Sequence, residues 1–174
     1  LSKTSSMILK NLNKSILINI SLIFLIFLLD RISKIYVIKL DKKILGSEIF
    51  TSKFLDINLI WNKGIAFGLF SFDQDKFYTF LTIFISLIVL IILFLFFKSK
   101  GITRYALLMI LGGALGNLYD RISFKAVPDF IDFHIGNLHW FIFNVADIFI
   151  TLGVIVMIIF ELIDNNKKNV DQKF

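Results

Sequence analysis

Long apolar runs, separated by short polar segments, dominate the pattern of hydrophobic and polar positions in this chain. About 20 helical residues are needed to cross a bilayer core of roughly 30 Å. Four runs are long enough or nearly so, at residues 16–37, 77–97, 105–123 and 141–163. The pattern predicts an integral membrane protein of the α-helical class, with four transmembrane helices in a single membrane domain, residues 1–174.

The two polar segments at residues 38–76 and 124–140 are predicted to lie on one side of the membrane, here called the outer side. Within them, Leu55–Trp61 and Ile131–Ile135 alternate in part between apolar and polar positions, which is typical of short strands. A Gly-Asn dipeptide after the second stretch is a turn signal. We therefore expect a small sheet that rests on the outer membrane surface.

The third apolar run is short and rich in small residues. Gly112 and Gly116 are four positions apart, a spacing that lets a second helix approach closely. We therefore expect the helix over this run to pack tightly against a neighbour.

Composition supports a membrane protein and excludes several kinds of site. Of the 174 residues, 57% are hydrophobic and 21 are phenylalanine, and the mean hydropathy is +0.82, which is too apolar for a soluble domain. The chain has no cysteine, so disulfides, thiol nucleophiles and thiolate metal sites are excluded. The isoelectric point is about 9.5, but the basic residues flank apolar runs, so we expect membrane lipids rather than nucleic acid as partners.

Four spans place both termini on one side of the membrane. Nine of the 19 Lys and Arg residues fall on that side, so their number alone does not decide the orientation. The nine lie in short segments next to the helix ends, where the positive-inside bias is read, and we expect both termini to be cytoplasmic. The first run lacks a small-residue cleavage site and is expected to be a retained helix rather than a removed signal peptide.

Polar and charged residues, with one glycine among them, gather at the predicted outer ends of the spans. They are Asp30, Lys34, Asn62, Gly64, Asn117, Asp120, Arg121, Asp129, Asn144 and Asp147. A charged side chain at the rim of a bilayer is costly, so it indicates a functional site by default. Because all of these residues reach the same membrane face, we expect a single site at the outer interface.

Asp129 and Asp147 are the candidate catalytic residues of this site. Two carboxylates a few Å apart cannot both ionise easily, so such a pair tends to share a proton and to supply one base and one acid. The alternative for Asp147 is a structural charge at a helix N-terminus, which the helix dipole favours. Asn144 lies three positions before Asp147, so both side chains are predicted to face one cavity.

The remaining charged residues have predicted supporting roles. Asp30 and Lys34, at positions i and i+4, are expected to form a structural ion pair. Asp120 is expected to stay ionised beside Arg121 and to be structural, whereas Arg121, which shares a helix face with Asn117, organises the site.

Other chemistries have weak support in the sequence. His134 and His139 are the only histidines, and no His-Glu-x-x-His run is present. Asp132 and His134 could share a strand face and bind a metal, but two ligands are weak evidence, so we expect no metal and no cofactor. Four other acidic positions are expected to be solvated loop residues, namely Asp56, Asp73, Asp75 and Asp132.

Four motifs of this chain, taken together, resemble those of the bacterial lipoprotein signal peptidase (signal peptidase II) family. The run LGGALGNLYDR at residues 111–121 is similar to the family's Gly-Gly-Ala-x-Gly-Asn-x-x-Asp-Arg motif. VPDF at 127–130 and FNVAD at 143–147 resemble its two aspartate motifs, and NKGIAF at 62–67 resembles its Asn-x-Gly-x-Ala-Phe motif. A fifth motif, usually Asp-Gln-x-Thr-Lys, differs here because Arg31 follows Asp30.

The resemblance implies a membrane-embedded aspartyl endopeptidase with four transmembrane helices, a small outer β-cradle and an outer loop. Asp129 and Asp147 would be its catalytic pair. Its substrates would be prolipoproteins, cut before a diacylglyceryl-modified cysteine, and its location the bacterial cytoplasmic (inner) membrane, where we expect a monomer. The groups that would bind substrate or support the site are Asn62, Gly64, Asn117, Arg121, Asn144, Asp30 and Lys34.

Two alternatives remain open at this point. An ion- or proton-coupled transporter subunit would use the charged groups as a relay, but it predicts charges spread through the membrane depth. A different intramembrane aspartyl protease would fit the Tyr119-Asp120 dipeptide, but the partner motif Gly-x-Gly-Asp is absent.

Overall fold

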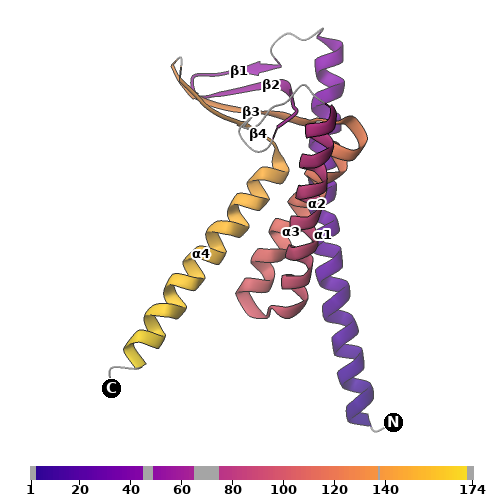
Figure 1. The fold of residues 1–174 in the computed structure, drawn as a ribbon, viewed down its shortest axis with the longest axis vertical. Helices are drawn as coiled ribbons and strands as arrows, with labels where there is room; N and C mark the ends of the chain where they lie inside the picture. Colours follow the sequence, from indigo (N-terminus) through magenta and orange to yellow (C-terminus); the bar gives the residue numbers. More distant parts are fainter. Residues whose placement is uncertain (1–2, 45–48, 65–74, 137, 172–174) are drawn as a thin grey trace.

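A computed structural model describes residues 3–44, 49–64, 75–136 and 138–171 of the chain. In chain order, its elements are α1 (Lys3–Lys43), β1 (Phe50–Thr51), β2 (Leu55–Asn62), α2 (Asp75–Lys98), α3 (Gly101–Phe124), β3 (Val127–Ile135), β4 (Leu138–Phe143) and α4 (Val145–Asp171). The sheet lies at one end of the helices, and both termini lie at the other end (Figure 1). The predicted architecture of four membrane-spanning helices and a small outer sheet is confirmed.

Each of the four described helices contains a segment long and apolar enough to cross a membrane. These segments are Ile16–Lys43, Tyr78–Lys98, Gly101–Phe124 and Val145–Asp164. The first helix continues to Lys43, six residues beyond the predicted span, because the charged residues at its end extend past the apolar stretch without a helix breaker.

The fourth helix begins at Val145 and not at residue 141 as predicted. Residues 141–143 belong to strand β4 instead. A short aromatic run does not distinguish a strand from a helix by its hydrophobicity, and here it merges in the sequence with the apolar run that follows. Asn144 separates the two elements, because it caps the helix.

Helix α3 packs against the other three helices, and its glycines make this possible. A Cβ atom at Gly112 would lie 2.8 Å from Cβ of Ile26, and one at Gly116 would lie 2.5 Å from Oδ2 of Asp30, so both glycines face α1. A Cβ atom at Gly113 would collide with the backbone oxygen of Ala146 in α4. The predicted close approach at the Gly112–Gly116 pair is confirmed, and α3 meets α1 and α4 closely at their outer ends.

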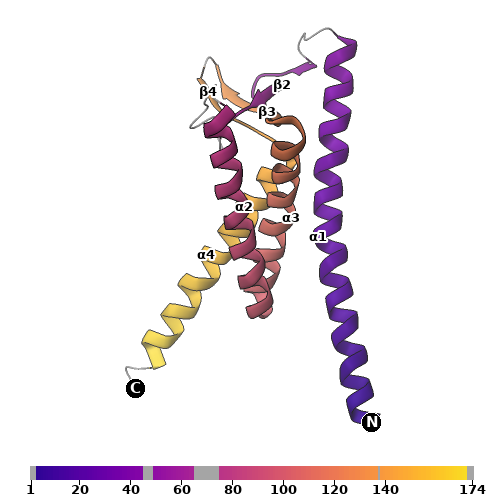
Figure 2. The same ribbon diagram turned by 45° about the vertical axis from the view of Figure 1, so that its right-hand side comes forward.

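The inner part of the bundle is held by a small apolar core around Ile26, Phe96, Leu107 and Ile110. The outward faces of the helices carry many exposed apolar side chains, as expected for contact with lipid tails. Helix α4 diverges from α1 with distance from the sheet, as both views show (Figures 1 and 2).

The four strands form one antiparallel sheet in the order β1-β2-β3-β4. The predicted strands at Leu55–Trp61 and Ile131–Ile135 lie within β2 and β3, whereas β1 and β4 were not predicted. The turn after β3 includes Gly136, whose φ of 60° favours glycine; Asn137 lies outside the described residues. The sheet brings the end of β2 beside the start of β3, where Asp129 lies.

Candidate active site

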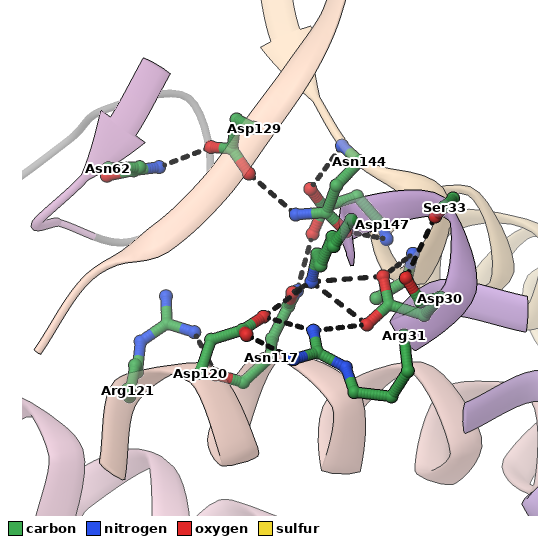
Figure 3. Close-up of polar contacts among 12 residues, drawn as sticks. Asp30, Arg31, Ser33, Asn62, Asn117, Asp120, Arg121, Asp129, Asn144 and Asp147 are labelled. Atoms are coloured by element: carbon green, nitrogen blue, oxygen red, sulfur yellow. Dashed lines mark hydrogen bonds and ion pairs between the residues drawn. The ribbon is translucent and has the colours of Figure 1, made fainter. Parts of the chain in front are cut away.

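Asp129 on β3 and Asp147 in the first turn of α4 belong to one polar cluster at the junction of the sheet and the helices (Figure 3). Asn144 lies between them and contacts both. Its side-chain amide Nδ2 donates to Oδ1 of Asp129 at 2.6 Å, and its backbone N–H donates to Oδ2 of Asp147 at 3.1 Å. A single residue therefore holds the two carboxylates together.

Asn144 and Asp147 also form the N-terminal cap of α4. The backbone N–H of Asp147 donates to Oδ1 of Asn144 at 3.2 Å, so the contact between the two residues is reciprocal. This arrangement is a capping box, which satisfies amides that the first helical turn leaves without partners. Asp147 therefore does lie at a helix N-terminus, as the alternative interpretation predicted. The cap also fixes the direction of its carboxylate.

Asp129 is buried, with 4% of its surface exposed, and its two described partners are neutral amides. Nδ2 of Asn62 donates to its Oδ2 at 2.8 Å, opposite the contact from Asn144. Burial raises the pKa of Asp129 to about 6, and the negative charge of Asp147 contributes in the same direction, while the two amide contacts oppose the shift. A carboxyl group with this pKa exchanges its proton close to neutral pH, as a general acid or base requires.

Asp147 has a different kind of support, because its amide partner is itself held by a charge. Nδ2 of Asn117 donates to Oδ1 of Asp147 at 2.8 Å. Oδ1 of Asn117 accepts a hydrogen bond from Nζ of Lys34, also at 2.8 Å. Asn117 therefore connects Asp147 on α4 to Lys34 on α1.

Lys34 belongs to a buried ionic network between α1 and α3. Its ammonium donates to Oδ2 of Asp30 at 3.0 Å and to Oδ2 of Asp120 at 2.7 Å, and all three side chains are fully buried. The guanidinium of Arg31 binds both oxygens of Asp120 and also Oδ2 of Asp30, at 2.9 Å. The other oxygen of Asp30 accepts the backbone N–H of Ala146 at 3.0 Å, which anchors the start of α4 to α1.

The predicted ion pair of Asp30 and Lys34 is present, but the predicted partner of Asp120 was wrong. Asp120 binds Arg31 and Lys34, and its described contacts do not include Arg121. Arg121 instead donates to the backbone oxygens of Gly64 and Asn117, while the side chain of Asp120 points toward α1. The signal for Arg31 was its charge within an apolar span, which requires a buried partner.

Arg121 connects α3 to the segment that follows β2. It donates to the backbone oxygen of Gly64 at 3.1 Å and to that of Asn117 at 3.2 Å. The backbone N–H of Gly64 in turn donates to Oδ1 of Asn62 at 2.8 Å, which orients this side chain toward Asp129. Arg121 thus links α3 to this segment through backbone contacts, and its organising role stays a prediction. The rest of that motif, residues 65–67, lies outside the described residues.

Two of the acidic residues predicted to be solvated are buried on the sheet. Asp56 lies 3.2 Å from Nε2 of His134, and Asp132 lies 2.8 Å from Nδ1 of His139. The two imidazole rings stack with their centroids 5.2 Å apart. The prediction failed because the pairing of β2, β3 and β4 brings each carboxylate beside a histidine of the neighbouring strand. Asp73 lies outside the described residues, and the side chain of Asp75 is not described.

Asp132 binds His139, and His134 lies beside Asp56. Within the described part of the chain, no group of three or more His, Asp or Glu side chains is arranged to hold a metal ion.

The geometry of this site can be compared with known proteins. The model of the family described as signal peptidase (SPase) II matches residues 22–163, which include every site residue discussed above. The chain belongs to the signal peptidase II family. It is therefore a membrane peptidase, and this agrees with its four spans and with two carboxylates at their outer ends.

Individual relatives agree with this assignment. The lipoprotein signal peptidase of Pelagibacter ubique (strain HTCC1062) is 50% identical over 155 residues, which cover 89% of this chain and 93% of the relative. That of Aquifex aeolicus (strain VF5) is 39% identical over 150 residues, covering 85% and 87%. A solved bacterial membrane enzyme has a TM-score of 0.69 and 29% identity, covering 86% of this chain and 90% of its own.

Proposed function

We propose that this signal peptidase II is an aspartic peptidase in which Asp129 and Asp147 are the catalytic pair. As a member of its family, the protein removes signal peptides from prolipoproteins, and we infer that it cuts before a lipid-modified cysteine. The observation that carries the assignment of the pair is Asn144, which donates to both carboxylates from one residue. No cofactor is needed for this chemistry.

The two carboxylates divide the steps of peptide hydrolysis between them. The ionised one removes a proton from a water molecule, and the resulting hydroxide attacks the scissile carbonyl carbon. The protonated one polarises the carbonyl oxygen and then gives its proton to the leaving nitrogen. The pair titrates as a unit, so the resting proton belongs to both residues. The raised pKa of Asp129 supports a shared proton near neutral pH.

The position of the site suits a lipid-modified substrate. The site lies where the helices meet the sheet, at the end of the molecule opposite both termini (Figure 1). With the termini in the cytoplasm, this end faces outward from the bacterial cytoplasmic membrane. The lipid anchor of the substrate would then remain in the bilayer and its signal helix would lie against the apolar spans, while the scissile peptide reaches Asp129 and Asp147. We expect the protein to act as a monomer, with membrane lipids and lipid-modified precursors as its partners.

Single Asp129→Asn and Asp147→Asn variants test the assignment on a lipid-modified precursor peptide. We expect each to lose nearly all cleavage, because each removes either the base or the acid of the reaction. Asp164→Asn, near the opposite end of α4 from Asp147, is the matched control and should cleave at the wild-type rate. Near-normal cleavage by either site variant would refute the catalytic pair. An unlipidated twin of the peptide tests the substrate class, and we expect it to be cut far more slowly.

The transporter alternative has a weaker structural basis. A relay across the membrane needs charged groups at successive depths. The described ionic network instead lies at the outer end of α1 and α3, and the apolar core around Ile26 and Leu107 lies beneath it. Ion flux by the purified protein in liposomes, without cleavage of the lipid-modified precursor, would favour this alternative.

A further inference from the structure

The buried network beside the site contains a balanced set of charges. Asp30 and Asp120 supply two negative charges, and Arg31 and Lys34 supply two positive ones. Asp30, Lys34 and Asp120 are fully buried, and Arg31 is 8% exposed. Buried charges of this kind are tolerated only when partners neutralise them, so removal of one cation leaves an uncompensated negative charge.

Lys34 fixes the orientation of the side-chain amide of Asn117. Its ammonium has three N–H groups, and they are used on Asp30, Asp120 and Asn117. An ammonium can only donate, so it selects the amide oxygen of Asn117. The amide nitrogen of Asn117 must then point the other way, toward Asp147. The direction of this amide, and with it one contact of Asp147, depends on Lys34.

Arg31 is the second cation that neutralises the two carboxylates bound by Lys34. Its guanidinium binds both oxygens of Asp120, and it reaches Asp30 as well. It also lies over the ring of Tyr119, 4.9 Å from the centroid, which holds the group in place from its other side. Among the described residues, the contacts of Arg31 do not include Asp129 or Asp147, so it acts on them through the network and through its charge.

We propose that Arg31 is a positioning residue of the peptidase reaction: by neutralising Asp120, it lets Lys34 hold Asn117 and thereby orient Asp147. Without Arg31, a single ammonium serves two carboxylates, and a net negative charge remains behind the catalytic pair. This inference rests on the proposed function of Asp129 and Asp147.

The other groups around the catalytic pair come from every element that packs against it, and the test leaves them unchanged. They are Asp30 and Lys34 of α1, Asn62 of β2, Asn117 and Arg121 of α3, and Asn144 at the start of α4. Because these groups are constant, a change of charge at residue 31 or 120 is the only variable.

The test is the pH dependence of kcat/KM for cleavage of a lipid-modified precursor peptide. For Arg31→Gln we expect both limbs of the profile to move to higher pH, by the order of one pH unit, because a lost positive charge favours the protonated forms of the pair. For Asp120→Asn we expect movement to lower pH. The double variant has the original net charge, so its profile should return toward wild type, and Arg31→Lys should retain the wild-type profile.

A residue that acts only on folding would lower the amount of active enzyme and leave the profile in place. Unshifted profiles for Arg31→Gln and Asp120→Asn would therefore overturn the inference while cleavage by the wild type upholds the proposed function. If Arg31→Gln does not fold, the opposite shift of Asp120→Asn and its reversal in the double variant decide the question. Absence of cleavage by the wild type, or full activity of Asp129→Asn, would instead contradict the proposed function.

Discussion

The two candidate catalytic carboxylates lie in one site but are supported by two different regions of the molecule. Asp129 comes from the sheet, and its described hydrogen bonds are from the neutral amides of Asn62 and Asn144. Asp147 comes from a helix, and its partner Asn117 is held by Lys34 and the ionic network behind it. The helix side is fixed by the two cations Lys34 and Arg31, whereas the carboxyl group on the strand side is held by neutral amides.

This difference gives the two carboxylates distinct surroundings although they share Asn144. Asp129 is buried on a strand between two neutral amides, and burial raises its pKa. The helix-borne Asp147 faces a network that contains two fixed cations and also caps its own helix. The same chemical group is therefore held in two different ways by the elements that carry it.

The largest expected difference between the two regions is in stability. Lys34→Met removes the ammonium shared by Asp30, Asp120 and Asn117, and loss of one partner from a buried ionic network costs about 3–5 kcal/mol of unfolding free energy. Asn62→Ala, on the strand side, removes one hydrogen bond to a carboxylate and should cost about 1–2 kcal/mol.

Denaturation of the purified protein in detergent measures both losses. Lys98→Met, at the inner end of α2, is a control for removal of a lysine charge and should be close to wild type. Equal losses for Lys34→Met and Asn62→Ala would show that the two regions are supported to the same degree.

The ionic network also marks the limit of what the sequence could predict. The clustering of Asp30, Lys34 and Asp120 at one end of the apolar runs follows from span positions alone. The pairing of Arg31 with Asp120 does not, because the two residues are 89 positions apart and meet only when α1 packs on α3. Periodicity assigns a residue to a face of its own helix but does not say which residue of another helix it meets.

The sheet shows a similar division. Alternation predicted β2 and β3, since both have polar positions between apolar ones. Strand β4 was missed because the run from Phe141 to Phe143 has no polar residue before Asn144. Asp56 and Asp132 were taken for solvated residues, since only the register of the strands brings each beside a histidine.

The second expected effect is on how the free energy of unfolding depends on pH, through the carboxyl group of Asp129. A raised pKa means that the folded state binds this proton more tightly than the unfolded state, so unfolding free energy falls as pH rises from about 4 to about 6. Asp129→Asn removes this titration. Relative to wild type, the variant should therefore gain about 3 kcal/mol of stability between pH 4 and pH 7, from a shift of about two pH units.

Denaturation curves of Asp129→Asn and wild type at the two pH values check this sign. Asn62→Ala keeps the titrating carboxyl group and should keep a fall in stability with pH at least as large as that of wild type. Parallel curves for Asp129→Asn and wild type would mean that burial does not raise the pKa of Asp129.

The smallest expected effect lies at the far end of the strand side, where His134 faces Asp56 across β2 and β3. Burial alone would lower the pKa of His134, but the carbonyl of Gly136 and the charge of Asp56 outweigh it and the pKa is raised. The stabilisation is therefore complete below the pKa of an unfolded histidine and is lost as pH rises through the higher folded value.

Hydrogen exchange of the β2 and β3 amides, followed by mass spectrometry, measures this local effect. In wild type, we expect slower exchange at pH 6 than at pH 8, after correction for the intrinsic rate. His134→Gln should abolish most of this difference, whereas His139→Gln, which leaves the contact of His134 with Asp56 intact, should retain it. If His134→Gln exchanges with the wild-type pH dependence, the contact of His134 with Asp56 does not stabilise the two strands in a pH-dependent way.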